Sequence, residues 1–333
     1  MAALQDVTNQ PNYRLRLSTA ASKSTSASPS ASASPSSPAS PSLPASPSAS
    51  ASSSKGTTPI TSSQLCEGLD GKIQRYPGIG GIRRAVDALS EKLREGETTD
   101  QYLVFRPVTV KELEKIDNQR YEVGKGIRLT HCADIETLII KVPTAEHEAV
   151  SRNFGDEFVA RAIGMGIPRE ERYRIGSTRF KGTSTSKEAD ESFKPRTLRP
   201  HKLDWPTLVL EAGISESLLR LRNDARWWLS NSGGRVNIVL IFHINQGTKT
   251  ILVEKWETTP ATGGPVTRSN QPPAQIPTQM QAITINQNNV TGTPLTLHFH
   301  KIFLRQPNPP EQDLVFTAQD LRDWSDNVWA GLS

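Results

Sequence analysis

The chain has 333 residues and a net charge of +5, with 35% hydrophobic and 22% charged residues. This composition is typical of a globular protein and excludes collagen, coiled coils and membrane-spanning proteins. From residue 26 to residue 54, all residues except Leu43 are Ser, Ala or Pro. Such a segment buries too little apolar surface to offset its chain entropy. We therefore expect residues 1–64 to be a disordered tail that is dispensable for folding.

The charge and the cysteines narrow the class of protein further. The tail carries most of the net positive charge, so the overall charge gives little support for a nucleic-acid partner. Cys66 and Cys132 lie far apart without Cys-x-x-Cys spacing, which argues against a disulfide framework or a closed zinc site. No signal peptide and no apolar run of about 20 residues is present. We expect an intracellular protein, nuclear or cytoplasmic, that is neither secreted nor bound to a membrane.

Apolar periodicity predicts a regular series of elements in the first half of the folded part. We expect a helix over residues 76–97, a strand over 101–110 and a short helix over 111–121. A buried strand over 136–143 and a long helix over 144–166 follow. Two strand-like segments follow at 171–182 and 187–195. The series predicts alternating strands and helices around one core.

The second half continues with a nearly all-apolar strand at 205–213, as expected for a strand covered on both faces. We next expect a helix at 215–234 and two strands at 235–244 and 248–257. An exposed loop at 258–291, a strand at 293–304 and a last helix that begins at Thr317 follow. This order predicts an α/β or α+β fold with a mixed sheet flanked by helices. We divide the chain into the tail, an N-terminal helix and strand extension over 65–135, and an α/β core over 136–333.

Two carboxylates occupy unusual places in this order. Glu211 ends the apolar strand directly before a helix, and Asp190 lies 21 residues earlier in the strand-like segment 187–195. Strand ends at the carboxyl edge of an α/β sheet are where such folds bind ligands. If the two strands are neighbours, the carboxylates repel each other and must protonate or bind a cation. Magnesium accepts a site of this kind, with water and phosphate oxygens as further ligands.

The residues around this pair resemble the PD-(D/E)XK nuclease superfamily, in particular its restriction endonuclease-like branch. The resemblance rests on Asp190, Glu211 in WPTLVLEAG, the following SES and a helix that carries Asp224, and it extends over about residues 138–257. It implies a restriction endonuclease-like mixed sheet, with Asp190 and Glu211 as catalytic residues and ligands of Mg²⁺.

The sequence departs from the family pattern at the lysine two residues after the Glu, which is Gly213 here. A cation there orients the nucleophile and offsets developing negative charge, which glycine cannot do. Arg220, Arg222 and Lys187 are candidate substitutes. We expect Arg222 to act as the catalytic surrogate because it lies at the edge of the buried stripe of its helix, and Arg220 to be a solvated partner of Asp224.

Two further groups of residues have binding potential. Lys194, Arg196, Arg199 and Lys202 form a basic run that we predict to contact nucleic-acid phosphates, although such runs are commonly just solvated. His298 and His300 would share one face of a predicted strand, but two ligands without a third make a poor metal site.

Two functions fit these patterns. The first is a metal-dependent nuclease-like domain that hydrolyses phosphodiester bonds of DNA or RNA. The second is a catalytically inactive binding or scaffold module with the nuclease fold, for which the tail acts as a tether. The absent lysine favours the second function, and the acid pair favours the first.

Overall fold

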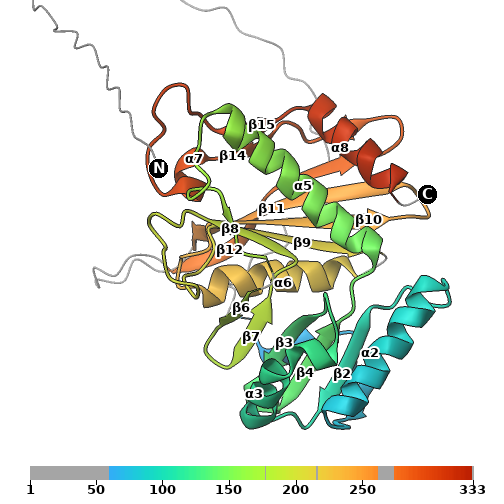
Figure 1. Cartoon of the computed structure of the whole chain (residues 1–333). Helices are drawn as coiled ribbons and strands as arrows, with labels where there is room; N and C mark the ends of the chain where they lie inside the picture. Colours follow the sequence, from blue (N-terminus) through green and yellow to red (C-terminus); the bar gives the residue numbers. More distant parts are fainter. Residues whose placement is uncertain (1–59, 177, 215–216, 262–273, 332–333) are drawn as a thin grey trace, which may run out of the picture. The chain divides into compact units, whose positions relative to one another are not determined.

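The computed structural model describes residues 60–176, 178–214, 217–261 and 274–331, which form two large β-sheets and a small one (Figure 1). Helices lie against the faces of both large sheets. The predicted α/β fold with a mixed sheet flanked by helices is therefore confirmed. Within the described residues, no helix combines the length and apolar character that a membrane span needs.

The first sheet has six strands in the order β1-β2-β4-β3-β7-β6. Its strands are β1 (Ile73–Arg75), β2 (Tyr102–Arg106), β3 (Arg128–Cys132), β4 (Thr137–Lys141), β6 (Arg179–Lys181) and β7 (Thr185–Glu188). Apolar residues of α2 (Ile79–Arg94) and α3 (Val110–Asn118) pack on one face. Helix α3 begins at a capping box, in which Thr109 and Glu112 bond each other's backbone N–H groups.

The second sheet has seven strands in the order β13-β12-β11-β10-β9-β8-β5. Its strands are β5 (Tyr173–Arg174), β8 (Glu191–Lys194), β9 (Leu208–Ile214), β10 (Ile238–Asn245), β11 (Thr250–Pro260), β12 (Gln275–Ile285) and β13 (Val290–Thr291). Only β9 and β10 are parallel, and α6 (Leu218–Asn231) connects them. Helices α5 (Ala145–Gly164) and α8 (Ala318–Ala330) pack on the face opposite α6.

Smaller elements complete the described chain. They are α1 (Ser62–Cys66), α4 (Arg120–Val123), α7 (Phe299–Phe303), β14 (Leu295–Leu297), β15 (Leu314–Phe316) and two 3₁₀ turns, η1 (Asp70–Lys72) and η2 (Ala133–Ile135).

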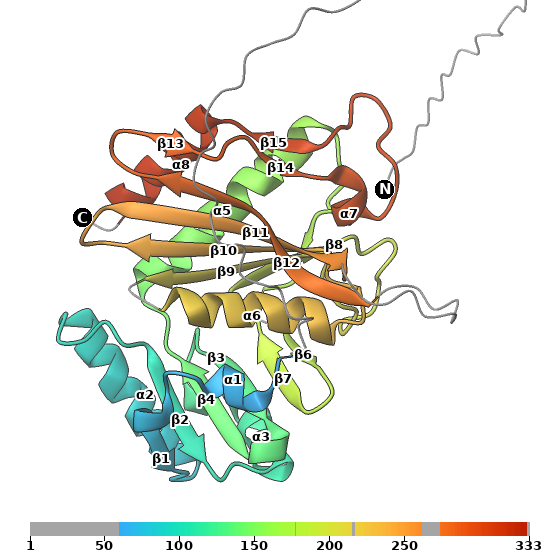
Figure 2. The ribbon, with the colours of Figure 1, turned by 180° about the vertical axis from the view of Figure 1, so that it is seen from behind.

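Helix α6 lies between the two large sheets and is buried on both sides (Figure 2). Trp228 faces the second sheet, where its indole N–H donates to Glu211 at 2.5 Å. Trp227 faces the first sheet, where its indole N–H donates to the Thr185 hydroxyl at 2.6 Å. The first sheet thus covers the helix face opposite the predicted apolar stripe.

Two predicted single strands are each divided between the two sheets. Segment 187–195 contributes to β7 and β8, with Ala189 and Asp190 at the crossing point. Segment 171–182 contributes to β5 and β6 in the same way. Because β4 belongs to the first sheet, the predicted domain boundary between residues 135 and 136 is wrong: it cuts that sheet between β3 and β4.

Two other predictions for the C-terminal part are wrong. Residues 258–291 are not one exposed loop, because β11 continues to Pro260 and pairs with β12 over its whole length. A polar outer face gives these strands the composition of a loop. Segment 293–304 is a short strand followed by α7, so it is not one continuous strand.

The predicted end of the tail at residue 64 is also wrong, whereas the expectation for residues 1–59 lies outside the described residues. Helix α1 has a capping box at Thr61, and the Ser62 hydroxyl donates to Asp134 at 2.5 Å. Leu65 and Cys66 are buried in the core between the first sheet and α6. Residues 60–66 therefore belong to the fold.

We predict that a chain beginning at Glu67 is less stable than one beginning at Ile60. The shorter chain loses the burial of Leu65, worth about 2 kcal/mol, so its melting temperature should be lower by about 5 °C for a chain of this size. Thermal unfolding followed by circular dichroism measures the difference. Equal melting temperatures would show that α1 adds nothing to stability.

Candidate active site at the junction of the two sheets

Asp190 lies where the chain passes from the first sheet into the second. Glu191 pairs with Leu210 in the antiparallel register of β8 and β9, and the next step of that register brings Asp190 to Glu211. The two candidate acids, 21 residues apart in sequence, are therefore neighbours across two strands.

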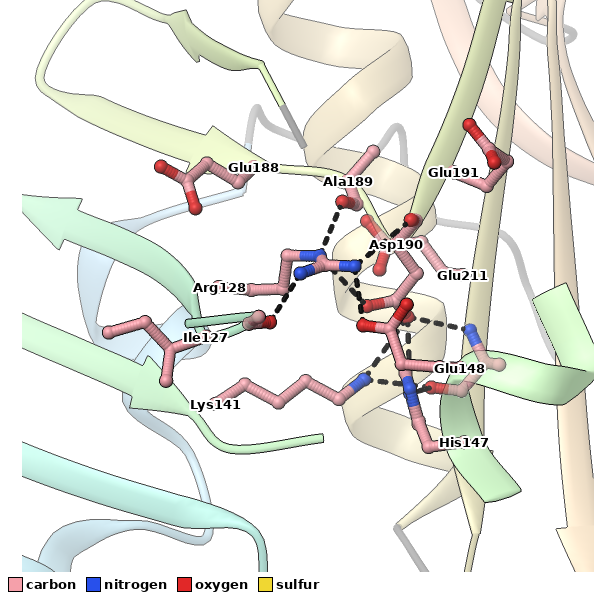
Figure 3. Close-up of polar contacts among 12 residues, drawn as sticks. Ile127, Arg128, Lys141, His147, Glu148, Glu188, Ala189, Asp190, Glu191 and Glu211 are labelled. Atoms are coloured by element: carbon pink, nitrogen blue, oxygen red, sulfur yellow. Dashed lines mark hydrogen bonds and ion pairs between the residues drawn. The ribbon is translucent and has the colours of Figure 1, made fainter. Parts of the chain in front are cut away.

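The Asp190 carboxylate is bound by groups from three other elements (Figure 3). Its Oδ2 atom accepts the backbone N–H of Ala212 on β9 at 2.9 Å and lies 3.2 Å from Nζ of Lys141 at the end of β4. Nε2 of His147, in the first turn of α5, is 3.3 Å from the same oxygen. Lys141 and His147 also contact the carbonyl oxygen of Ala212, at 2.8 and 2.6 Å.

Arg128, the first residue of β3, binds the backbone around this carboxylate. Its Nε donates to the Ala189 carbonyl at 3.0 Å and lies 3.9 Å from Asp190 Oδ1. Its Nη2 contacts Glu148 on α5 at 2.6 Å. The guanidinium thus connects the first sheet, the crossing point and α5.

These surroundings keep Asp190 ionised. Burial alone would raise the pKa of its carboxyl, but the charges of His147 and Lys141 and the hydrogen bond from His147 hold that pKa well below the ordinary value. The side chain is only 2% exposed.

Glu211 is held in the opposite state. Burial, with the nearby charges of Asp190 and Asp224, raises its pKa to about 8, and Lys187 opposes this shift. Lys187 Nζ lies 3.4 Å from Glu211 and 3.1 Å from Asp224, so its single charge is shared. At neutral pH Glu211 is therefore largely protonated beside an ionised Asp190.

Some of the oxygens at this junction are of the kind that a hard divalent cation binds. Asp190 Oδ1 is buried without a hydrogen-bond partner, and the Ala212 carbonyl oxygen points to the same place as Asp190 Oδ2, since Lys141 contacts both. Two carboxyl groups and a carbonyl suit magnesium, which usually completes its ligands with water. In the described part of the chain, no three His, Cys, Asp or Glu residues are grouped so as to hold a metal.

Two cavities lie at the carboxyl end of β9, next to this cluster. One, of about 200 Å³, is lined by Thr144 and Ile214 among others, and the second, of about 270 Å³, is lined by Ile214, Tyr102 and Arg220. Ile214 is two residues after Ala212. Both cavities therefore lie near the carboxyl end of β9, and Asp190 and Glu211 are not among their lining residues.

Both candidate arginines contact groups that the sequence did not predict. Arg222 binds Glu254 on β11 with Nε and Nη2, at 3.1 and 2.5 Å. The register puts Ile241 between Glu254 and Glu211, so Arg222 is two strands from the predicted site. Arg220 is not a solvated partner of Asp224: it is buried, donates to the Leu65 carbonyl and lies over the Tyr102 ring.

The predicted phosphate-binding run is divided between buried and exposed side chains. The ammonium of Lys194 is bound by the carbonyls of His201, Lys202 and Asp204, and Arg199 Nη1 by those of Trp205, Pro206 and Arg235. Through these contacts the two cations hold the loop together, and Arg199 is half-buried. Arg196 and Lys202 are exposed.

His298 and His300 are not on a strand. His298 precedes α7 and its Nδ1 lies 2.8 Å from Asp313, while its ring stacks on that of His300.

Sequence analysis missed Lys141, His147 and Arg128. Lys141 is the one charged residue in the apolar run TLIIKV, and His147 accompanies the helix cap Thr144, whose hydroxyl accepts its N–H. The position of Lys141 at the end of an apolar strand was the signal from which its role could have been predicted. Their convergence on Asp190 depends on contacts between distant parts of the sequence.

Comparison with known proteins adds little. No family model and no curated protein matches the sequence. Among solved structures, the chain is similar to "a putative nuclease belonging to DUF820" from Anabaena variabilis ATCC 29413, with 14% identity and a TM-score of 0.32, over 56% of this chain and 87% of that one. A likeness this distant carries no argument about the site.

We predict that Asp190→Asn strongly destabilises the protein and Glu211→Gln does not. The first change removes the buried negative charge that Lys141 and His147 contact, at a cost of about 3 kcal/mol or more. The second replaces a neutral acid by a neutral amide of the same shape, so we expect less than about 1 kcal/mol near pH 7. Urea unfolding measures both. Equal losses would contradict the opposite ionisation of the two acids.

We also predict a pH dependence that belongs to Glu211. The folded state keeps this proton up to about pH 8, whereas the unfolded state releases it near the ordinary value of 4.5. Between these values the folded state binds more protons, so the free energy of unfolding decreases as pH rises. Relative to Glu211→Gln, the wild-type protein should lose stability from about pH 5 to about pH 8. A constant difference across this range would refute the raised pKa.

Proposed function

We propose that the protein is a metal-dependent nuclease of the PD-(D/E)XK type that hydrolyses phosphodiester bonds of DNA or RNA. The observation that carries the proposal is the adjacency of Asp190 and Glu211, with the Lys187 ammonium 3.4 Å from Glu211. Two acids and a lysine are the residue types that the superfamily resemblance implies. Lys187 takes the place that Gly213 leaves empty.

Each residue has a distinct part in this proposal. Asp190, Glu211 and the Ala212 carbonyl would hold Mg²⁺, which supplies Lewis acidity toward a phosphate oxygen and a water of lowered pKa. Lys187 holds a positive charge beside Glu211, where it offsets negative charge that develops on phosphate. Lys141 contacts both Asp190 and Ala212, so its ammonium would have to move for the cation to bind these oxygens.

A second candidate function is a non-catalytic binding module with the same fold. It is favoured by the burial of both acids and by the pairing of Asp190 with the chain's own cations, which gives these groups a purely structural role. The two functions differ in whether magnesium is needed for cleavage of a nucleic acid.

We predict that the full chain cleaves DNA or RNA only with Mg²⁺ or Mn²⁺, and that Glu211→Gln and Lys187→Met each lower the rate at least about a hundredfold. Glu211→Gln is the decisive variant because we expect it to remain folded. Cleavage of labelled single-stranded and double-stranded substrates gives the rates.

Asp87→Asn is the matched control, since this exposed carboxylate of α2 pairs with Arg83 at the helix surface. It should retain full activity. If the wild-type protein cleaves none of these substrates with either metal, the binding-module function replaces the nuclease. If Glu211→Gln cleaves as fast as the wild type, the catalysis has another site.

A further inference from the structure

A depression lined by three cationic side chains lies beside β6. Its volume is about 380 Å³, and we call it the basic pocket; it is lined by Ile175, Thr178, Arg179, Lys181, Lys202 and Leu203. Only Lys202 belongs to the basic run that the sequence singled out. The other two cations come from a strand of the first sheet.

Strand alternation and one aromatic contact assemble the basic pocket. Arg179 and Lys181 are two residues apart on β6 and share a face. Phe180 points the other way, is 2% exposed and stacks on Trp205 at a centroid distance of 5.2 Å. Because Trp205 ends the loop that carries Lys202, this contact brings Lys202 to Lys181.

The basic pocket retains positive charge that the described residues do not neutralise. Arg179 pairs with Asp117 through Nη2, but its Nη1 is buried without a hydrogen-bond partner. Lys181 and Lys202 are exposed, and no ion pair connects either of them to an acid in the part of the chain that the structure describes. Glu188 lies opposite Arg179 in the register of β6 and β7 and also acts on its charge, so the three cations face two carboxylates, Asp117 and Glu188.

We propose that the basic pocket binds a phosphate group of a nucleic-acid backbone. A guanidinium edge and two mobile ammonium groups around a small depression suit a tetrahedral anion. Two residues before Ile175, the Tyr173 ring is covered by Arg196 at 5.2 Å, which extends the cationic surface. This surface offers a phosphodiester chain successive contacts.

The position of the basic pocket relative to the acid pair deepens the proposed nuclease function, on which this inference rests. Phe180 on β6 pairs with Lys187 on β7, the residue whose ammonium contacts Glu211. Arg179 and Lys181 flank Phe180. The side chains of Arg179 and Lys181 lie on the opposite face of the sheet from Phe180 and Lys187. A nucleic-acid strand held in the basic pocket would therefore pass the edge strand β6 to bring another of its phosphates to Lys187.

The test measures nucleic-acid binding without catalysis. The probe is a labelled single-stranded oligonucleotide of roughly 16 nucleotides, as DNA and as RNA. Its fluorescence anisotropy is recorded in EDTA at salt concentrations from about 50 to about 200 mM. The variant is Lys181→Gln with Lys202→Gln. The control is Lys92→Gln with Lys111→Gln, which removes two exposed lysines from α2 and α3.

We expect the basic-pocket variant to bind roughly tenfold more weakly, with a salt slope lower by about 0.7 for each lysine, while the control binds like the wild type. Equal losses in both variants would overturn the proposal, since they would reflect overall charge. Tighter binding of inorganic phosphate than of the oligonucleotide, or an equal loss of polyglutamate binding, would assign the pocket to a free anion or an acidic peptide and overturn it too.

Binding in EDTA separates this inference from the proposed function. Lysine-dependent binding without any metal-dependent cleavage would refute the nuclease and leave the phosphate site standing. Cleavage by the wild-type protein, with unchanged binding by the Lys181 and Lys202 variant, would refute the phosphate site alone.

Discussion

The buried carboxylate of Asp190 is the interaction on which the arrangement of the two sheets depends. A carboxylate removed from water costs several kcal/mol unless other groups compensate its charge. Here the compensation comes from β4 through Lys141, from α5 through His147 and from β9 through the Ala212 N–H. Each of these elements is fixed relative to the crossing point by the same oxygen, Oδ2 of Asp190. Stability and the candidate site therefore share one group.

The same constraint gives the two acids different ionisation states. Asp190 lies beside several cationic groups, whereas Glu211 shares the charge of Lys187 with Asp224 and lies almost entirely out of water. Two neighbouring carboxyl groups whose pKa values are displaced in opposite directions are typical of sites that bind cations or transfer protons. Glu211 lies in the middle of β9 and not at its end, where the sequence had placed it. Structural ion-pair networks produce such shifts as well, so the shifts support the nuclease proposal only together with the adjacency of the two acids.

Sequence reasoning located the elements whose signal is local. The apolar run that ends at Glu211 and the periodicity of α6 were sufficient for that strand and that helix. The division of segment 187–195 between two sheets was not predictable, because alternating polar residues look the same in either sheet. Arg222 shows the same limit: its predicted place at the edge of the buried stripe fits its half-buried guanidinium, but its partner Glu254 comes from a strand that helix geometry does not reveal.

The crossing point also explains how a lysine reaches Glu211 although Gly213 stands where the PD-(D/E)XK pattern has its lysine. Lys187 and Asp190 are three residues apart, on either side of the change of sheet. The chain leaves the first sheet between Lys187 and Asp190. Lys187 therefore stays on β7 and faces α6 and Glu211, while Asp190 lies beside Glu211 at the start of β8. One short segment thus supplies an anion to the second sheet and a cation from the first. A lysine on β9 itself would add another buried charge beside Lys187, and glycine avoids that cost.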